Sequence, residues 1–457
     1  MRDEIEARPL VLVFIGLAIG LTAVALPVGL VVLFGFVWVV RPIRGRLLIA
    51  FAFILGLLSA PTPPRPVFEA VPVHGLATIS SVPKLYADRQ VFNAQLNGRT
   101  LEISTGPAGI LSLGDRFEIS GIEKPVPVFA EGYASVMGIE GRVSLDYVQV
   151  EERGPWVYRV ASAWRQSFVA FFAGCMPEPL ANMVDAVSFN AKTLLDAPTQ
   201  KELKDSGLIH IVTASGLQVL ALAVLVAGLL RFLPVPRHLQ VGLLCLVLSM
   251  YAIGAGLNPA VVRATVMAIA GLAAYLVMRE PDPLSALALT GVGYLVWSPV
   301  SIYNVGFQLS YITVAAVVLF FKRAPSRRGR TREEFIRVAN DFLRLSGVIL
   351  AAITPLSAYT FGVVSVVSVG SNLLDGWCTP LLVLLAFLTH GLSWVLPAVA
   401  QEIAGHFVDP LASWVTSAPE WAGRWGSTVT VPPFSGYWLV LFYGAWALTY
   451  RRRIVQP

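Results

Sequence analysis

The sequence predicts a polytopic α-helical membrane protein with about 11–12 spans, some short or broken, and an inserted extracytoplasmic all-β domain of the OB type. Hydrophobic residues make up 56% of the 457 residues and charged residues only 14%, whereas a soluble domain has roughly 25% charged residues. Long apolar runs recur along the chain, and residues 61–153 interrupt them with an alternating pattern. The net charge of +6 fits Lys and Arg in cytoplasmic loops better than a nucleic-acid-binding surface.

Residues 1–60 contain the first apolar runs. The run over 9–40 is too long for one helix, since about 20 residues cross the hydrocarbon core, and too long for the apolar core of about 7–15 residues in a signal peptide. Pro27 and Gly29 near its middle predict two short spans in a hairpin, and residues 47–60 a third span. Arginines at both ends of the hairpin place those ends inside, so the third span leads outside.

Residues 61–153 predict a small barrel. Apolar residues occupy every second position, and Asn97-Gly98 is a hairpin signal. About five strands in this length are typical of an OB barrel, over the segments GLATISSV, RQVFNAQL, RTLEIST, DRFEISGI and GRVSLDYVQV. The segment has 8 Lys and Arg against 11 Asp and Glu, which argues against a strong electrostatic trap for DNA.

Residues 154–206 predict amphipathic helices in the membrane interface. Tryptophans and phenylalanines of the first helix are expected opposite Arg159 and Arg165, an arrangement typical of a helix that lies along a bilayer.

Residues 207–457 predict the main transmembrane domain. The expected spans cover 208–230, 239–256, 259–278, 284–298, 303–321, 343–362, 366–390, 391–407 and 435–450. The basic loop over 322–334 is predicted inside, and the loops near 257, 300 and 364 carry no Lys or Arg and are predicted outside.

The stretch GLIHIVTASGLQV (207–219) opens this domain with four polar side chains and a glycine in an apolar run. At 100° per residue, His210, Thr213, Ser215 and Gln218 spread over about 200° of a straight helix. A break near Gly216 would relieve this spread, because glycine tolerates bending. The alternative is hydrogen bonding between packed helices, with Gly216 allowing close approach.

Three further polar clusters lie in predicted spans. Asn258 precedes a helix that carries Arg263 about one turn in, where the cation either lines a wet passage or snorkels to the outer interface. Gln308 and Ser310 lie about one turn from the outer surface, where they line a passage or serve helix packing.

The last cluster, SVGSNLLDGW (368–377), contains Asn372 and Asp375. Asp375 is the one carboxylate we find well inside a predicted span. Proton-coupled transporters commonly use relays of several Asp, Glu or His residues, so a single carboxylate argues against proton coupling. Pairing with a neighbouring helix is an equal alternative.

No enzyme motif is recognisable in the chain. Walker, GxSxG and HExxH patterns are missing, and His210 and Ser215 lie about 140° apart on a straight helix. The three cysteines have no metal-ligand spacing. We therefore expect neither catalytic residues nor a metal or other cofactor.

These motifs together resemble the ComEC competence channels. GLIHIVTASGLQV is similar to the family's GLxHxxxxSGLHV motif, although Gln218 stands where the family usually has histidine. The stretches NPAVVRATVM, FQLSYITVAAV and SNLLDGWCTPLLV follow in the family's order. FAEGYASVMGI (129–139) and the OB insertion extend the resemblance to the N-terminal half.

The resemblance implies a bacterial inner-membrane channel that passes single-stranded DNA into the cytoplasm during natural transformation. His210, Ser215, Gly216, Arg263, Gln308 and Asn372 occupy the motif positions. Many members continue into a metallo-β-lactamase-like nuclease domain, whereas this sequence ends at RRRIVQP and has no HxHxDH cluster. The expected partners are therefore an extracytoplasmic DNA receptor, a separate nuclease, a cytosolic motor ATPase and membrane lipid.

A DNA passage must be wet and lined by donors or cations. The expected lining is His210, Thr213, Ser215, Gly216, Gln218, Asn258, Arg263, Gln308, Ser310, Asn372 and Asp375. Aromatic residues along the passage would stack on the bases, and the candidates are Tyr251, Tyr303, Phe307 and Tyr311. Two alternatives stay open: a transporter for a small or lipid anion, and an intramembrane hydrolase built on His210 and Ser215.

Overall fold

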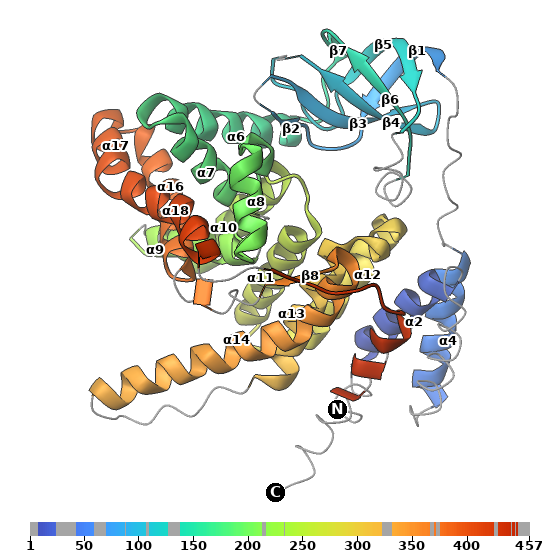
Figure 1. Cartoon of the computed structure of the whole chain (residues 1–457), viewed down its shortest axis with the longest axis vertical. Coiled ribbons are helices and arrows are strands. Elements are labelled where there is room, and N and C mark those ends of the chain that lie inside the picture. The colour runs from blue at the N-terminus through green and yellow to red at the C-terminus, as the bar shows by residue number, and fades with distance from the viewer. Residues whose placement is uncertain are drawn as a thin grey trace, which may run out of the picture. The chain divides into compact units, whose positions relative to one another are not determined.

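The computed structural model describes residues 8–23, 43–58, 70–86, 88–106, 109–126, 138–212, 216–232, 234–321, 331–365, 370–371, 375–424, 428–439, 441–443 and 445–446 (Figure 1). The chain forms two compact units, each discontinuous in sequence. Unit 1 combines Met1–Thr62, Ala273–Val364 and Thr428–Pro457, and unit 2 combines Pro63–Leu272 and Ser365–Ser427. The four consecutive segments expected from the sequence, 1–60, 61–153, 154–206 and 207–457, stay a prediction.

Unit 1 is built from apolar helices that pack closely. They are α2 (Pro9–Ala23), α4 (Ile43–Leu58), α12 (Pro283–Trp297), α13 (Val305–Phe320) and α14 (Thr331–Phe361), with the 3₁₀ turn η3 (Pro299–Tyr303) before α13. Glycine brings α2 and α4 together, since a Cβ placed on Gly16 would lie 2.6 Å from the carbonyl oxygen of Ile49.

Helices α2 and α12 run parallel, as contacts at both ends show. The Arg8 side chain pairs with Asp282 at 2.7 Å where both helices begin, and the hydroxyl of Tyr303 donates to the carbonyl of Leu21 at 2.8 Å where they end. Burial raises the pKa of Asp282, but hydrogen bonds from Arg8 and Ser285 outweigh burial and hold it below its usual value. The shared end agrees with the sequence-based topology, which starts both helices inside.

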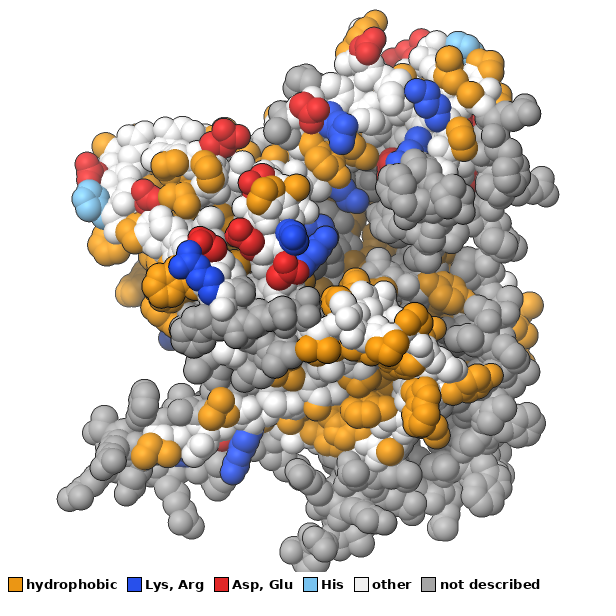
Figure 2. Space-filling view, viewed as in Figure 1, with side chains coloured by type: hydrophobic (Ala, Val, Ile, Leu, Met, Phe, Trp, Pro, Cys, Tyr) orange, Lys and Arg blue, Asp and Glu red, His pale blue; other side chains and the backbone are white. Residues whose placement is uncertain are grey.

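Three of the described helices are long and apolar enough to cross a membrane. They are α10 (Arg237–Gly254), α11 (Pro259–Leu276) and the part of α14 over Leu343–Phe361. The other apolar helices among the described residues have fewer than 18 residues, which suits the expectation of short spans. On the visible face of unit 1, hydrophobic side chains predominate over α12 and α13, and the charged side chains of unit 2 gather over the barrel and α8 (Figure 2).

Unit 2 contains the predicted barrel. Its strands are β1 (Val71–Ile79), β2 (Lys84–Leu85), β3 (Gln90–Leu96), β4 (Arg99–Thr105), β5 (Arg116–Lys124), β6 (Ile139–Leu145) and β7 (Val150–Glu152). The order β1-β3-β4-β6-β5 closes into a ring because β1 also pairs with β5. Inward-facing apolar residues alternate with outward polar ones, and Phe92 and Phe117 meet edge to face inside the barrel. A five-stranded barrel in this order is typical of the OB fold. Most of the stretch FAEGYASVMGI (129–139) lies outside the described residues.

An ion pair with a buried carboxylate holds one side of the barrel, and the arginine of the pair, Arg99, is 39% exposed. Glu123 is fully buried and accepts from both Nη atoms of Arg99, at 2.6 and 3.1 Å. Glu140 accepts from Nε of the same arginine at 2.8 Å. Loss of the arginine would leave the buried carboxylate of Glu123 unpaired, which is costly. The ion pair therefore holds β4, β5 and β6 together.

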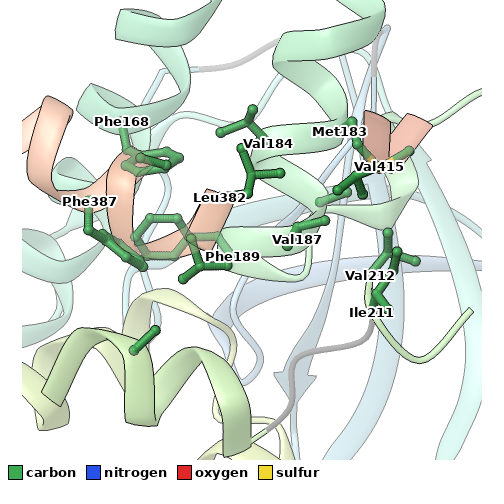
Figure 3. Close-up of a cluster of buried hydrophobic side chains, with 14 of the residues drawn as sticks. Phe168, Met183, Val184, Val187, Phe189, Ile211, Val212, Leu382, Phe387 and Val415 are labelled. Atoms are coloured by element: carbon green, nitrogen blue, oxygen red, sulfur yellow. The ribbon is translucent and has the colours of Figure 1, made fainter. Parts of the chain in front are cut away.

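Helices α6 (Trp156–Cys175) and α7 (Glu178–Phe189) form the core of unit 2 (Figure 3). Phe168, Phe189 and Phe387 pack ring against ring, and the last turns of α7 are buried throughout. The prediction that Arg165 faces away from the phenylalanines of α6 is wrong. Arg165 is buried on the same face as Phe168, because its Nη1 reaches the carbonyl of Pro83 in the barrel at 3.3 Å.

Arg165 also compensates a buried carboxyl of α7. Burial raises the pKa of Asp185 to about 7, and the nearby Arg165 opposes that rise. Burial in turn lowers the pKa of Arg165 to about 10, with Asp185 acting against it. The two groups therefore lie inside the core of unit 2, where the field of each partly offsets the desolvation of the other.

The remaining helices of unit 2 are α8 (Ala197–Asp205), after the 3₁₀ turn η2 (Lys192–Leu194), α9 (Gly216–Leu230), α10, the first part of α11, α16 (Cys378–Ser393), α17 (Pro397–Ile403) and α18 (Asp409–Arg424). A π-helical turn, η4 (Ala404–Val408), joins α17 to α18, and the short strands β8 (Val363–Ser365) and β9 (Thr428–Thr430) pair.

The prediction of one span over 391–407 is wrong. Helix α16 ends at Ser393, and a turn separates it from α17 because Pro397 begins a new helix.

The barrel gives the first prediction. A Cβ on Gly141 would lie 2.2 Å from the Glu123 carboxylate, so Gly141→Ala should break the pair with Arg99 and destabilise the protein by about 3 kcal/mol. The measurement is the denaturation midpoint of the full chain, followed by protease cleavage inside 71–152. Gly109→Ala is the matched control, because nothing lies within 4 Å of its added Cβ; equal midpoints for the two variants would contradict the role of the pair.

Candidate functional site

The opening motif is a turn followed by a helix. Residues 209–212 form turns, and α9 begins at Gly216, which agrees with the predicted interruption near this glycine. His210 is exposed, and its Nδ1 lies 3.0 Å from the carbonyl of Gly207. Thr213 and Ser215 lie outside the described residues.

Gln218 ties three segments together. Its side chain is 2% exposed, and Nε2 donates to the carbonyls of Val187 at 2.9 Å and Ile211 at 3.4 Å. The hydroxyl of Tyr251 on α10 donates to the next carbonyl, Ser188, at 2.7 Å. Carbonyls in the last turn of a helix have no partner within it, so these two side chains satisfy the C-terminal end of α7. Sequence reasoning did not identify this role, although a glutamine and a tyrosine in apolar helices were its signal.

Gly216 lies against the first turns of α11. A Cβ at Gly216 would approach Ala264 Cβ at 3.4 Å and Nη2 of Arg263 at 3.6 Å. The structure thus brings together two of the predicted site residues, 47 positions apart in the sequence. Arg263 is 7% exposed and lies in the second turn of α11, a helix long enough to cross a membrane. A buried cation at such a position is costly unless it is paired or functional.

Asn258 positions the start of α11. Its Oδ1 accepts from the backbone N–H of Ala260 at 3.2 Å, which satisfies one donor at the helix start. Leu257 has a φ of 51° and Gly256 a φ of 91°, so the chain turns tightly between α10 and α11. The observed contact of Asn258 is therefore that of a helix cap, one turn before Arg263.

Asp375 is buried just before α16. Thr379 donates to its Oδ2 at 2.6 Å, and its Oδ1 has no hydrogen-bond partner in the part of the chain that the structure describes. Neighbouring Ser371 donates to the carbonyl of Ser206 at 2.8 Å, so this segment is held to the end of α8. Sequence reasoning did not find Ser206, and Asn372 lies outside the described residues.

Gln308 and Ser310 belong to unit 1 and lie on α13. Nε2 of Gln308 donates to the carbonyl of Ile302 at 2.8 Å and so holds the 3₁₀ turn η3 against α13. Both residues are half-buried.

The aromatic residues expected to stack bases serve the interior instead. Tyr251, Phe307 and Tyr311 are buried, because Tyr251 packs against Phe189 and Phe387 and the other two rings stack on each other at 4.2 Å. Tyr303 uses its hydroxyl to join η3 to α2. The prediction of base stacking is therefore wrong for the three buried rings, and for half-buried Tyr303 it stays a prediction.

The site so assembled consists of the turn over 207–212, held to α9 through Ile211 and Gln218, and of the start of α9, which lies against the first turns of α11. It holds one buried cation, hydrogen-bond donors and a glycine contact. Within the described residues, no group of three His, Cys, Asp or Glu side chains is placed to hold a metal ion. The site therefore combines the buried cation of Arg263 with the exposed imidazole of His210.

Comparison with known proteins defines the family. A family model described as "Competence protein" matches residues 187–453, more than half of the chain and the region that contains the site. The chain is also 25% identical to ComE operon protein 3 of Bacillus subtilis (strain 168) over 223 residues, which is 48% of this chain and 27% of that protein. No solved structure matches.

The molecule is thus a mainly helical protein with apolar helices and a small barrel. The chain belongs to the competence protein family and is of the ComEC type. The match spans about a quarter of the Bacillus subtilis relative.

Gln218 supplies the second prediction. Gln218→Leu would leave the carbonyls of Val187 and Ile211 buried without this donor, at a cost of about 1–3 kcal/mol. The measurement is the thermal midpoint of the purified full chain in detergent. Gln240→Leu is the matched control, since Gln240 also donates to a carbonyl, at 3.0 Å, but is only half-buried. A Gln218→Leu midpoint equal to that of Gln240→Leu would refute the capping role.

Proposed function

We propose that this chain is a multi-pass protein of the bacterial inner membrane through which single-stranded DNA enters the cytoplasm during natural transformation. One observation carries the proposal: the family match includes the site where Gly216 lies beside the buried cation of Arg263. Involvement in DNA uptake follows from the family. The channel role, the multi-pass topology of about 11–12 spans and the inner-membrane location are the proposed refinements.

A strand in transit carries one phosphate charge per nucleotide. The passage therefore needs donors and cations that replace water without holding the strand tightly. Arg263 supplies charge, and His210 supplies a donor at the exposed turn before α9. Arg263 is almost fully buried in the structure, so in this proposal the strand reaches it only after α9 and α11 separate at the Gly216 contact.

The remaining predicted residues have separate roles in this proposal. Gln218 and Asn258 position the helices, as their hydrogen bonds support. Gln308 and Ser310 on α13, together with Thr213, Ser215, Asn372 and Asp375, remain proposed path residues.

The chain itself acts as a channel without catalysis. Energy for transport comes from a cytosolic motor ATPase, the strand arrives from an extracytoplasmic DNA receptor, and a separate nuclease removes the other strand. A transporter for a small or lipid anion would use similar donors, and the family match does not favour it.

The proposal is tested by DNA uptake in a deletion strain complemented with this chain. Labelled duplex DNA should yield cytosolic single strands only when the chain is present, because the strand has no other route through the bilayer. Equal accumulation of single strands without the chain would exclude the channel role. Restored transport of a small anion with no effect on DNA would instead establish the transporter.

Arg263 gives a residue-level prediction. Arg263→Ala should reduce uptake roughly tenfold to a hundredfold, the equivalent of about 1.5–3 kcal/mol for a lost hydrogen bond to a charged phosphate, while membrane insertion is unchanged. Arg279→Ala is the matched control, because Arg279 is exposed just beyond the other end of α11. If both variants take up DNA at the wild-type rate, Arg263 does not contact the strand.

A further inference from the structure

The segment after α16 exposes large apolar side chains in an unusual density. The turn between α16 and α17 exposes Trp394, Val395 and Leu396. Farther along, Trp414 is 41% exposed and Trp421 60% exposed on α18. Soluble surfaces rarely expose such residues together, so this surface requires a partner.

The opposite side of α18 is already used by the fold. Ala412, Val415 and Ala418 are buried in the core of unit 2, where α18 contacts α7 and α8. This packing fixes the rotation of the helix, so the direction of its exposed side chains is set by the structure.

The exposed side of α18 is divided into two stripes. Trp414 and Trp421 are seven residues apart and therefore about 20° from alignment on the helix. Ser417 and Arg424 form a second line about 60° away. Arg424 pairs with Glu420 at 2.6 Å, so polar groups gather on one side of the aromatic stripe while the buried core lies on the other.

Residues 397–424 run as one continuous helix through the π-helical turn. At 1.5 Å per residue its length is about 42 Å, well beyond the roughly 30 Å hydrocarbon core. His406 and Asp409 lie near its middle and Glu402 one turn before them, and charged groups at such depth are expensive inside a bilayer. This helix is therefore unsuited to crossing a membrane.

We infer that the helix over 397–424 lies along the bilayer surface, with its aromatic stripe at the boundary between headgroups and acyl chains. Tryptophan combines a large apolar ring with an N–H donor and concentrates at that boundary. The Glu420–Arg424 stripe then faces water, as in amphipathic helices of the interface. The inference rests on the proposed membrane location.

Continuity with α16 identifies lipid as the partner. Helix α16 is one of the apolar helices of the chain, and the exposed turn over 394–396 connects its end directly to α17. Exposed Val399 and Phe407 lie between this turn and Trp414, so large apolar side chains recur from the end of α16 to α18, as expected at the edge of a bilayer. A second copy of the chain or a partner protein would need a matching groove instead.

Spin labelling tests the orientation of α18 directly. The three cysteines, Cys175, Cys245 and Cys378, are first replaced by alanine. A single cysteine then replaces Trp414, Trp421, Ser413, Glu420 or Leu246, and the full chain is reconstituted in phosphatidylcholine–phosphatidylglycerol vesicles. Collision rates with oxygen, which enters lipid, and with a water-soluble nickel complex are compared for each label.

Labels at 414 and 421 should show at least a twofold higher oxygen-to-nickel ratio than their neighbours at 413 and 420. Leu246, exposed on the candidate span α10, is the reference for lipid. If 414 and 421 resemble 413 and 420 while 246 faces lipid, the inference is overturned and the membrane location stands. If 246 also faces water, the proposed membrane location itself fails.

A second measurement keeps the native cysteines. Lipids brominated near the headgroup should quench fluorescence of the wild-type chain more than that of the Trp414→Phe, Trp421→Phe double variant. The fluorescence that these two residues contribute should fall at least twofold. If this contribution is not quenched, the helix does not lie in the interface.

Discussion

The end of α7 is the point on which the helical part of unit 2 depends. Its last carbonyls, Val187 and Ser188, are buried, and side chains from α9 and α10 provide donors to them. An unmet buried carbonyl costs about 1–3 kcal/mol, so Gln218 and Tyr251 fix both helices relative to α7. Through α9, this constraint also sets the position of Gly216, and hence the place where α11 approaches.

That approach produces the chemistry of the site. Gly216 at the start of α9 lies against Ala264 and the guanidinium of Arg263, and the turn over 207–212 leaves His210 exposed. A cation at the start of an apolar helix is a costly arrangement that positioning by α7 makes possible. Within the helical part of unit 2, Gln218 thus holds α9 to α7, and Gly216, two residues earlier, lies against Arg263 of α11.

Periodicity predicted much of this fold because it depends on local spacing. Alternation predicted the five main barrel strands, and apolar runs predicted α10, α11 and the apolar part of α14. The partners of Gln218 could not be predicted, because Val187 lies 31 residues away and no local pattern marks a carbonyl at a helix end. Arg165 and Tyr251 were misjudged for a similar reason: hydrogen bonds to distant carbonyls accompany their burial.

The central claim is that the strand passes the starts of α9 and α11. The most direct measurement uses the wild-type chain and DNA that carries 4-thiothymidine along its length, with a bulky protein on one end to arrest it in transit. Irradiation cross-links the strand to the residues it contacts, and mass spectrometry locates them. The account predicts cross-links within residues 207–219 and in the first turns of α11 around Arg263. Cross-links confined to other parts of the chain would contradict it.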